Sequence, residues 1–97
     1  MRIALIHALK HSILPIEAAF AKLWPAASLV NLLDDSLSAD VARDGRSTDG
    51  MTERFLRLGR YAAGTCADAI LFTCSAFGSC IEAVAREQAP MPVLKPN

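Results

Sequence analysis

Four short apolar runs, separated by segments long enough to hold helices, constrain the fold of this chain more than any other feature. The runs are RIALIH over residues 2–7, SLVNLL over 28–33, AILFT over 69–73 and PVL over 92–94. Nearly continuous apolar residues are typical of parallel strands buried on both faces, and parallel strands need long crossover connections. Right-handed crossovers then place helices on both faces of the sheet. The sequence therefore predicts one α/β domain over residues 1–97, with a parallel four-stranded, doubly wound sheet flanked by helices.

Apolar residues at helical spacing occupy the connections between these runs. One helix is predicted with Pro15 in its first turn and its end before Pro25. A second, short helix is predicted to end at Gly45, and a third to begin at a Thr52 cap. The buried stripe expected on the third helix consists of Phe55, Leu58, Ala62 and Cys66. The last helix is predicted from about residue 76 to residue 88.

The composition and the charge pattern exclude several classes of protein. Hydrophobic residues make up 53% of the chain and charged residues 21%, so the chain can bury enough apolar surface to fold. Ten Lys and Arg balance ten Asp and Glu without a basic cluster, which argues against nucleic acids and anionic membranes as partners. The longest uncharged stretch, 69–81, is shorter than the ~20 residues of a membrane span, and no signal-peptide pattern is present. These features predict a cytoplasmic protein.

Polar residues follow the predicted strands at their carboxyl ends, where doubly wound sheets bind ligands. His7 ends the first run, Asp34 and Asp35 follow the second, Thr73–Ser75 end the third, and 95–97 follow the fourth. His7 can bind a substrate or tune a nearby thiol if the first and third strands are neighbours, or it can be a satisfied polar residue of the core. The two aspartates can contact a substrate amine or cap the next helix.

Cys74 is the strongest candidate for chemistry, because it lies in a predicted strand-to-helix turn. Backbone amides and the positive end of the helix can favour a thiolate there. Ser75 and the amides of Ala76 and Phe77 can hold a small carboxylate by the same geometry. The alternative is that Cys74 is a small buried hydrophobic residue at the end of a strand.

The other cysteines and the missing motifs limit the cofactors to be expected. Cys66 and Cys80 fall on predicted buried helix faces and are interpreted as core thiols. Three cysteines without zinc-site spacing favour neither a disulfide framework nor a structural metal site. No glycine-rich phosphate loop follows the first run, so no nucleotide cofactor is expected.

The segments RIALIHA, DDSLSADVARDG, FTCSAFGSCIEA and PVLKPN together resemble the aspartate/glutamate/hydantoin racemase superfamily, which also includes arylmalonate decarboxylases and maleate isomerases. The resemblance covers essentially the whole chain. It implies cofactor-independent chemistry at a carbon next to a carboxylate, in a cleft between two similar α/β halves. One cysteine thiolate removes the α-proton and a second cysteine, on the opposite face of the substrate, returns one.

The resemblance also assigns roles to individual residues. Cys74 matches the cysteine of the family's first half, and Thr73, Ser75 and Ala76 match the positions whose hydroxyls and amides hold the carboxylate. His7 matches a substrate-contacting position. Two departures matter: family members are about twice as long, near the size of two domains, and Ser75 stands where Asn or Thr is frequent. The chain is therefore expected to be the first half of a longer enzyme, and the second cysteine to belong to the other half.

Three functions remain open at this point. The first is an amino-acid or hydantoin racemase with Cys74 as one acid/base residue. The second is a non-catalytic α/β module that binds a small carboxylate or self-associates through an uncovered apolar face. The third is a one-cysteine decarboxylase or cis–trans isomerase acting on a diacid. A small carboxylate is the partner expected in the first and third cases, and a homo-oligomer in the self-associating form of the second.

Overall fold

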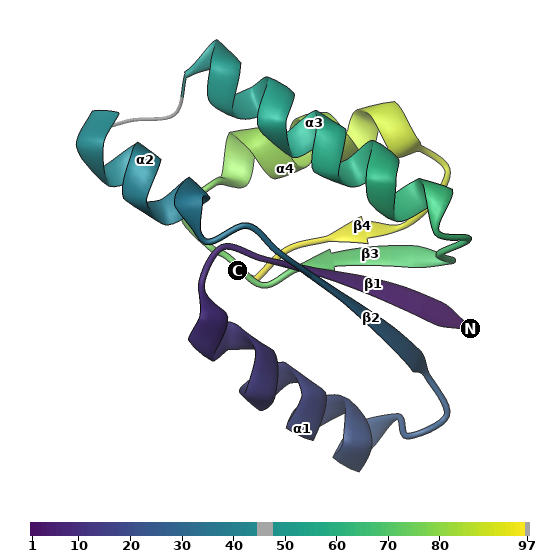
Figure 1. Ribbon diagram of the computed structural model, residues 1–97. Coiled ribbons are helices and arrows are strands. Elements are labelled where there is room, and N and C mark those ends of the chain that lie inside the picture. Colours follow the sequence, from purple (N-terminus) through teal and green to yellow (C-terminus); the bar gives the residue numbers. More distant parts are fainter. Residues whose placement is uncertain (45–47, 97) are drawn as a thin grey trace.

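The computed structural model describes residues 1–44 and 48–96, and contains the predicted parallel sheet (Figure 1). Its strands are β1 (Arg2–His7), β2 (Ser28–Leu33), β3 (Ala69–Phe72) and β4 (Val93–Leu94). All three pairings are parallel, and the strand order is β2-β1-β3-β4. The predicted fold class is therefore confirmed. Gly45, the predicted helix end, and Asn97 lie outside the described residues.

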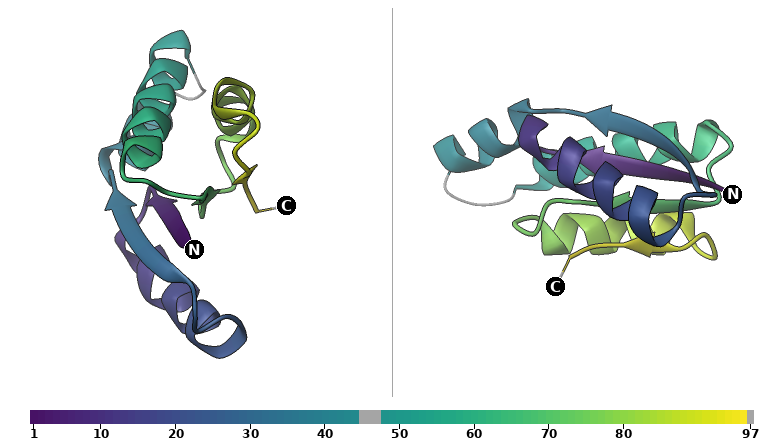
Figure 2. Two further views of the ribbon diagram at one scale, coloured as in Figure 1. Left: turned by 90° about the vertical axis from the view of Figure 1, so that its right-hand side faces the viewer. Right: turned by 90° about the horizontal axis from the view of Figure 1, so that it is seen from below.

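The helices cover both faces of this sheet, as expected for a doubly wound fold. A short 3-10 turn, η1 (Lys10–Ser12), leads into α1 (Ile13–Leu23), which lies on one face. The opposite face is covered by α3 (Asp49–Gly64) and α4 (Gly78–Gln88), which pack side by side (Figure 2). Between β2 and α3 the chain forms α2 (Ser36–Asp44).

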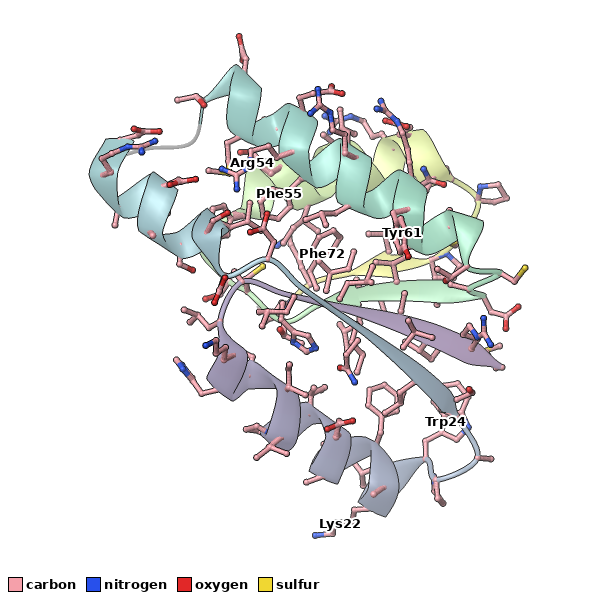
Figure 3. The ribbon with its side chains drawn as sticks, viewed as in Figure 1. Lys22, Trp24, Arg54, Phe55, Tyr61 and Phe72 are labelled. Carbon is pink, nitrogen blue, oxygen red and sulfur yellow. The ribbon has the colours of Figure 1, made fainter. Side chains whose placement is uncertain are left out.

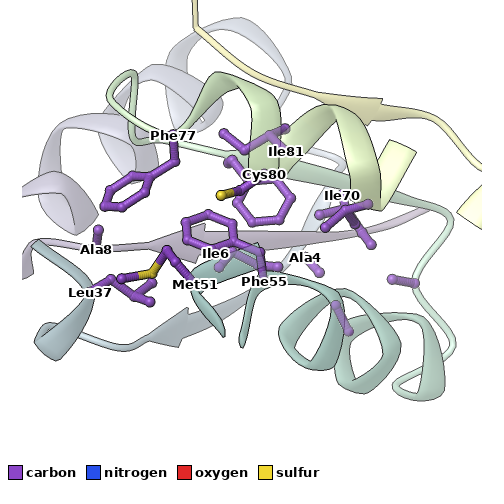
Figure 4. Close-up of a cluster of buried hydrophobic side chains, with 14 residues drawn as sticks. Ala4, Ile6, Ala8, Leu37, Met51, Phe55, Ile70, Phe77, Cys80 and Ile81 are labelled. Carbon is purple, nitrogen blue, oxygen red and sulfur yellow. The ribbon is translucent and has the colours of Figure 1, made fainter. Parts of the chain in front are cut away.

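The main hydrophobic core lies between the sheet and the pair α3 and α4 (Figure 4). Phe55 of α3 stacks on Phe72 of β3 with ring centroids 5.5 Å apart, and packs against Phe77 in a tilted arrangement with ring centroids 4.8 Å apart. All three rings are buried, as are Ile81 and Val84 of α4. Aromatic pairs at these separations contribute about 0.5–1.5 kcal/mol each beyond their buried area. This cluster fixes the two helices against the sheet.

The third helix differs from the prediction at both ends. Thr48, not Thr52, caps α3, and its hydroxyl oxygen accepts a hydrogen bond from the Met51 amide at 3.1 Å. The helix then ends at Gly64, two residues before Cys66. Cys66 has a φ of 64° and is exposed, so its assignment to the buried stripe is wrong. The buried stripe consists instead of Met51, Phe55, Gly59 and Ala62, at helical spacing.

Gly59 lets α3 approach α4 closely. A Cβ atom at this position would lie 2.6 Å from Cγ1 of Val84, a stiff side chain that is itself buried. We therefore expect Gly59→Ala to lower the free energy of unfolding by about 1–3 kcal/mol through overpacking, measured by urea denaturation.

The matched control is Gly64→Ala in the same helix, where a Cβ atom would meet nothing within 4 Å. This variant should keep or slightly raise the stability, because Ala favours helix over Gly by about 1 kcal/mol. Equal effects of the two substitutions would contradict a close approach at Gly59.

Candidate functional site

The carboxyl ends of β1 and β3 bring together two of the predicted site residues. Ile6 pairs with Phe72 in the β1–β3 register, and the Thr73 amide continues the ladder by donating to the Ile6 carbonyl at 3.0 Å. The next residue of β1, His7, therefore lies beside Thr73, with Nδ1 2.7 Å from the threonine Oγ. The strand order reverses between β1 and β3, which is where doubly wound sheets bind ligands. β1 and β3 are therefore neighbours in the sheet, which is the condition set above for a role of His7 at the site.

Two further polar residues hold the other side of the His7 ring. Nε2 of His7 lies 2.8 Å from Oδ1 of Asn31 in β2, and Nδ2 of Asn31 donates to the carboxylate of Glu17 in α1 at 3.2 Å. His7 is fully buried, so its two ring nitrogens depend on these protein partners. A polar chain thus runs from α1 across β2 and β1 to Thr73. The sequence patterns did not indicate Asn31 or Glu17, although a single amide in the apolar run SLVNLL is an unusual feature.

Cys74 follows Thr73 but faces the other side of the sheet. It is half-buried and packs against the core under α3 and α4. The helix after it begins at Gly78 with Phe77 as its N-cap, later than the predicted start near Ala76. Cys74 therefore lies in the connection before the helix, separated from its N-cap by Ser75 and Ala76. Ser75 and Ala76 are exposed in the intervening turn.

The surroundings of Cys74 favour the neutral thiol. Burial raises the pKa of the Cys74 thiol above its ordinary value, and the nearby Cys80 raises it further, while a backbone hydrogen bond opposes both. At neutral pH Cys74 is consequently a proton donor rather than a thiolate. Cys80 is fully buried, and its Sγ lies 3.5 Å from the Thr52 hydroxyl, which confirms its assignment as a core thiol.

A hollow of about 580 Å³ opens on the α1 side of the sheet edge, beside Thr73. Its wall is largely apolar, and two residues that can carry positive charge, His11 and Lys95, stand among its lining residues. The full lining is His11, Ser12, Pro15, Ile16, Leu71, Phe72, Thr73, Lys95 and Pro96. Of the polar residues predicted at the carboxyl ends of the strands, Thr73 and Lys95 line this hollow.

Asp34 performs the structural role that was the alternative to substrate binding. Its Oδ1 accepts from the Ser36 amide at 3.0 Å at the start of α2, and its Oδ2 accepts from Arg54 of α3 at 3.2 Å. Arg54 also donates to Asp40 at 2.7 Å and thereby connects α3 to α2 (Figure 3). Partial burial alone would raise the pKa of Asp34, but the hydrogen bonds from Ser36 and the nearby Arg54 outweigh it and lower the pKa. Asp35 is exposed in the turn that precedes α2.

Comparisons of the chain with protein-family models, with curated proteins and with solved structures find no significant match. Over residues 1–44 and 48–96, no helix has the length and apolar character needed to cross a membrane. In the same part of the chain, no group of three or more His, Cys, Asp or Glu residues is placed to hold a metal ion.

The protonated state of Cys74 leads to a measurable order of reactivity. We expect iodoacetamide to modify the exposed Cys66 first, Cys74 more slowly than free cysteine at neutral pH, and the buried Cys80 only on unfolding. Because its pKa is raised, Cys74 should gain reactivity at a higher pH than free cysteine does. Peptide mass spectrometry of the folded chain across a pH series measures this, and a Cys74 faster than free cysteine at neutral pH would contradict it.

Proposed function

We propose that the protein is a cytoplasmic, cofactor-independent isomerase of the racemase type, in which Cys74 exchanges a proton with the carbon next to a substrate carboxylate. The observation that carries this proposal is the position of Thr73, held by His7, directly before the half-buried thiol of Cys74 at the reversal of strand order. The resemblance of FTCSAFGSCIEA to the racemase superfamily supports the same assignment of roles.

The hollow beside Thr73 suits a carboxylate attached to an apolar group. Lys95 and His11 can attract the negative charge, and the largely apolar lining can accept the rest of the molecule. In this proposal the carboxylate lies between Thr73 and the turn of Ser75 and Ala76. Hydroxyls and amides there would stabilise the enediolate that forms when the α-proton leaves.

The thiol of Cys74 fits the protonation half of the reaction. A neutral thiol can give its proton to the α-carbon of an enediolate, and the resulting thiolate can remove an α-proton in the opposite direction. Inversion of a stereocentre needs a second acid/base residue on the other face of the substrate, which the resemblance assigns to a second half. A decarboxylase is a related candidate, favoured by the raised pKa of Cys74, because it needs Cys74 only to protonate the enediolate that remains when carbon dioxide leaves. A cis–trans isomerase would instead need a Cys74 thiolate that adds to the double bond and leaves after rotation, which the raised pKa disfavours.

The racemase proposal predicts exchange of the substrate α-proton with solvent deuterium. On a panel of amino acids and 5-substituted hydantoins, Cys74→Ser should slow exchange by about 10²-fold or more, the usual contribution of a general acid/base. Cys66→Ser is the matched control, since it makes the same atomic change at an exposed cysteine before β3, at the other end of that strand from Cys74. NMR loss of the α-proton signal in D₂O measures the rate. Equal exchange by the wild type and Cys74→Ser would exclude Cys74 as the proton-transferring group.

A second candidate, a self-associating module, is favoured by the uncovered apolar side of α1. Leu23 and Trp24 at the end of this helix are 79% and 42% exposed. Together with Ile16, Ala19 and Phe20 they line a second hollow of about 260 Å³, next to the first. Contiguous exposed apolar surface of this kind is typical of an interface.

This second candidate predicts association that depends on one side of α1. In sedimentation equilibrium, Leu23→Glu should shift an associated chain to the monomer. Leu14→Glu is the matched control, because Leu14 is 76% exposed on the same helix but lines neither hollow. A monomeric wild type, or equal effects of both variants, would count against self-association through this surface.

A further inference from the structure

We infer that Glu17 and Asn31 are positioning residues that place the proton of His7 on Nε2 and thereby set the direction of the Thr73 hydroxyl. This inference rests on the proposed function, in which Thr73 meets the substrate carboxylate. None of the sequence patterns that predicted the site includes either residue. Their role follows from the direction in which each hydrogen bond of the chain must run.

The direction is set at the Glu17 end, because an ionised carboxylate can only accept hydrogen bonds. Asn31 must therefore turn its NH₂ group toward Glu17, at 3.2 Å, and its Oδ1 toward His7, at 2.8 Å. An amide oxygen can only accept, so the proton of the neutral imidazole is on Nε2. Nδ1 then carries a lone pair and accepts the Thr73 O–H at 2.7 Å, in preference to the Ile6 carbonyl at 3.5 Å from the same hydroxyl.

This arrangement controls what Thr73 can offer a ligand. With neutral His7, the only hydroxyl proton of Thr73 is used by His7, and Oγ offers lone pairs alone to the hollow. A carboxylate oxygen at Thr73 needs a donor. A second proton on Nδ1 supplies one, because His7 then donates to Oγ and the Thr73 O–H turns to the carboxylate. The one bond formed is N–H on Nδ1, and its proton comes from the buffer.

Binding of a carboxylate at Thr73 is therefore coupled to the uptake of a proton by His7. The ionisable group linked to the ring is Glu17 from α1, through Asn31. Cys74, after β3, faces the opposite side of the sheet. Asp34 follows β2, and its amide donates to the His7 carbonyl at 3.1 Å, while its carboxylate is bonded to Ser36 and Arg54. His11 lines the same hollow as Thr73. A carboxylate should consequently bind more tightly at lower pH, with up to about a tenfold loss of affinity per pH unit once His7 is neutral.

The first experiment tests the positioning without any ligand, by ¹⁵N NMR of the 97-residue chain labelled at histidine. The exposed His11 serves as an internal reference. We expect His7 to be the Nε2–H tautomer, with Nδ1 at the shift of an unprotonated ring nitrogen. Glu17→Gln should give a mixture of tautomers, because a glutamine amide can also donate and so lets the Asn31 amide turn over. Glu82→Gln, on the exposed side of α4, is the control.

A purely structural role for Glu17 predicts a different result. Gln can still bond to Asn31, so a link that merely fastens α1 to the sheet would leave the His7 spectrum unchanged. An unchanged spectrum in Glu17→Gln, or a wild-type His7 with its proton on Nδ1, would overturn the inference.

The second experiment measures proton uptake by titration calorimetry with phenylacetate, in two buffers of different ionisation enthalpy at a pH where His7 is neutral. About one proton should be taken up per phenylacetate bound by the wild type.

His7→Gln should bind phenylacetate without proton uptake, because the glutamine amide can always donate a hydrogen bond to Thr73. The uncharged control ligand is 2-phenylethanol. Binding to the wild type without uptake would overturn the coupling. Absence of any phenylacetate binding would overturn the carboxylate site of the proposed function, while the NMR result judges the positioning by itself.

Discussion

The central position of β1 is the constraint on which the rest of the structure depends. This strand pairs with β2 on one side and with β3 on the other, and its residues from Ile3 to His7 are all buried. Successive side chains alternate between the faces of a sheet, so Ala4 and Ile6 join the core under α3 and α4, while His7 lies on the α1 side. The α1 layer and the layer of α3 and α4 therefore lie on opposite faces of this one strand. The same geometry buries the polar side chain at its carboxyl end.

Burial of His7 makes the hydrogen-bond chain a structural requirement as well as a functional device. An unpartnered buried polar group costs about 1–3 kcal/mol, and among residues 1–44 and 48–96 every buried side-chain nitrogen and oxygen has a partner. The link from Glu17 through Asn31 also fastens α1, which has no fully buried residue, to the sheet. Stability and site geometry thus depend on the same few contacts. A change at Glu17 or Asn31 affects both stability and site geometry. Glu17→Gln is informative because it removes the charge but nearly keeps the shape of the side chain.

The sequence predicts the sheet well because each strand is an unbroken apolar run, and burial on both faces requires such a run. It predicts the α3 start and the position of Cys66 poorly, because an N-cap and a helix end depend on local hydrogen bonds that Thr48 and Thr52 can both offer. At the candidate site, the strand ends predicted that His7 and Thr73 would lie at one edge of the sheet, and the two side chains do lie beside each other there. The sheet face of Cys74 could not be read from the turn, because it follows from where β3 ends relative to α4. The role of Asn31 could not be predicted, because its partner Glu17 is 14 residues away in the sequence and lies on another element.

Thr73 and Cys74 are adjacent in the chain, yet they face opposite sides of the sheet edge. This alternation continues the pleat of β3 and gives the two residues different surroundings. Thr73 lines the hollow on the α1 side and is hydrogen-bonded to His7. Cys74 packs against the apolar core, where burial raises the pKa of its thiol and keeps the thiol protonated. In the proposed reaction, a carboxylate held on the α1 side would present its α-carbon at the edge itself. The group that binds charge and the group that moves a proton would then act from two environments, tuned separately by the two helical layers.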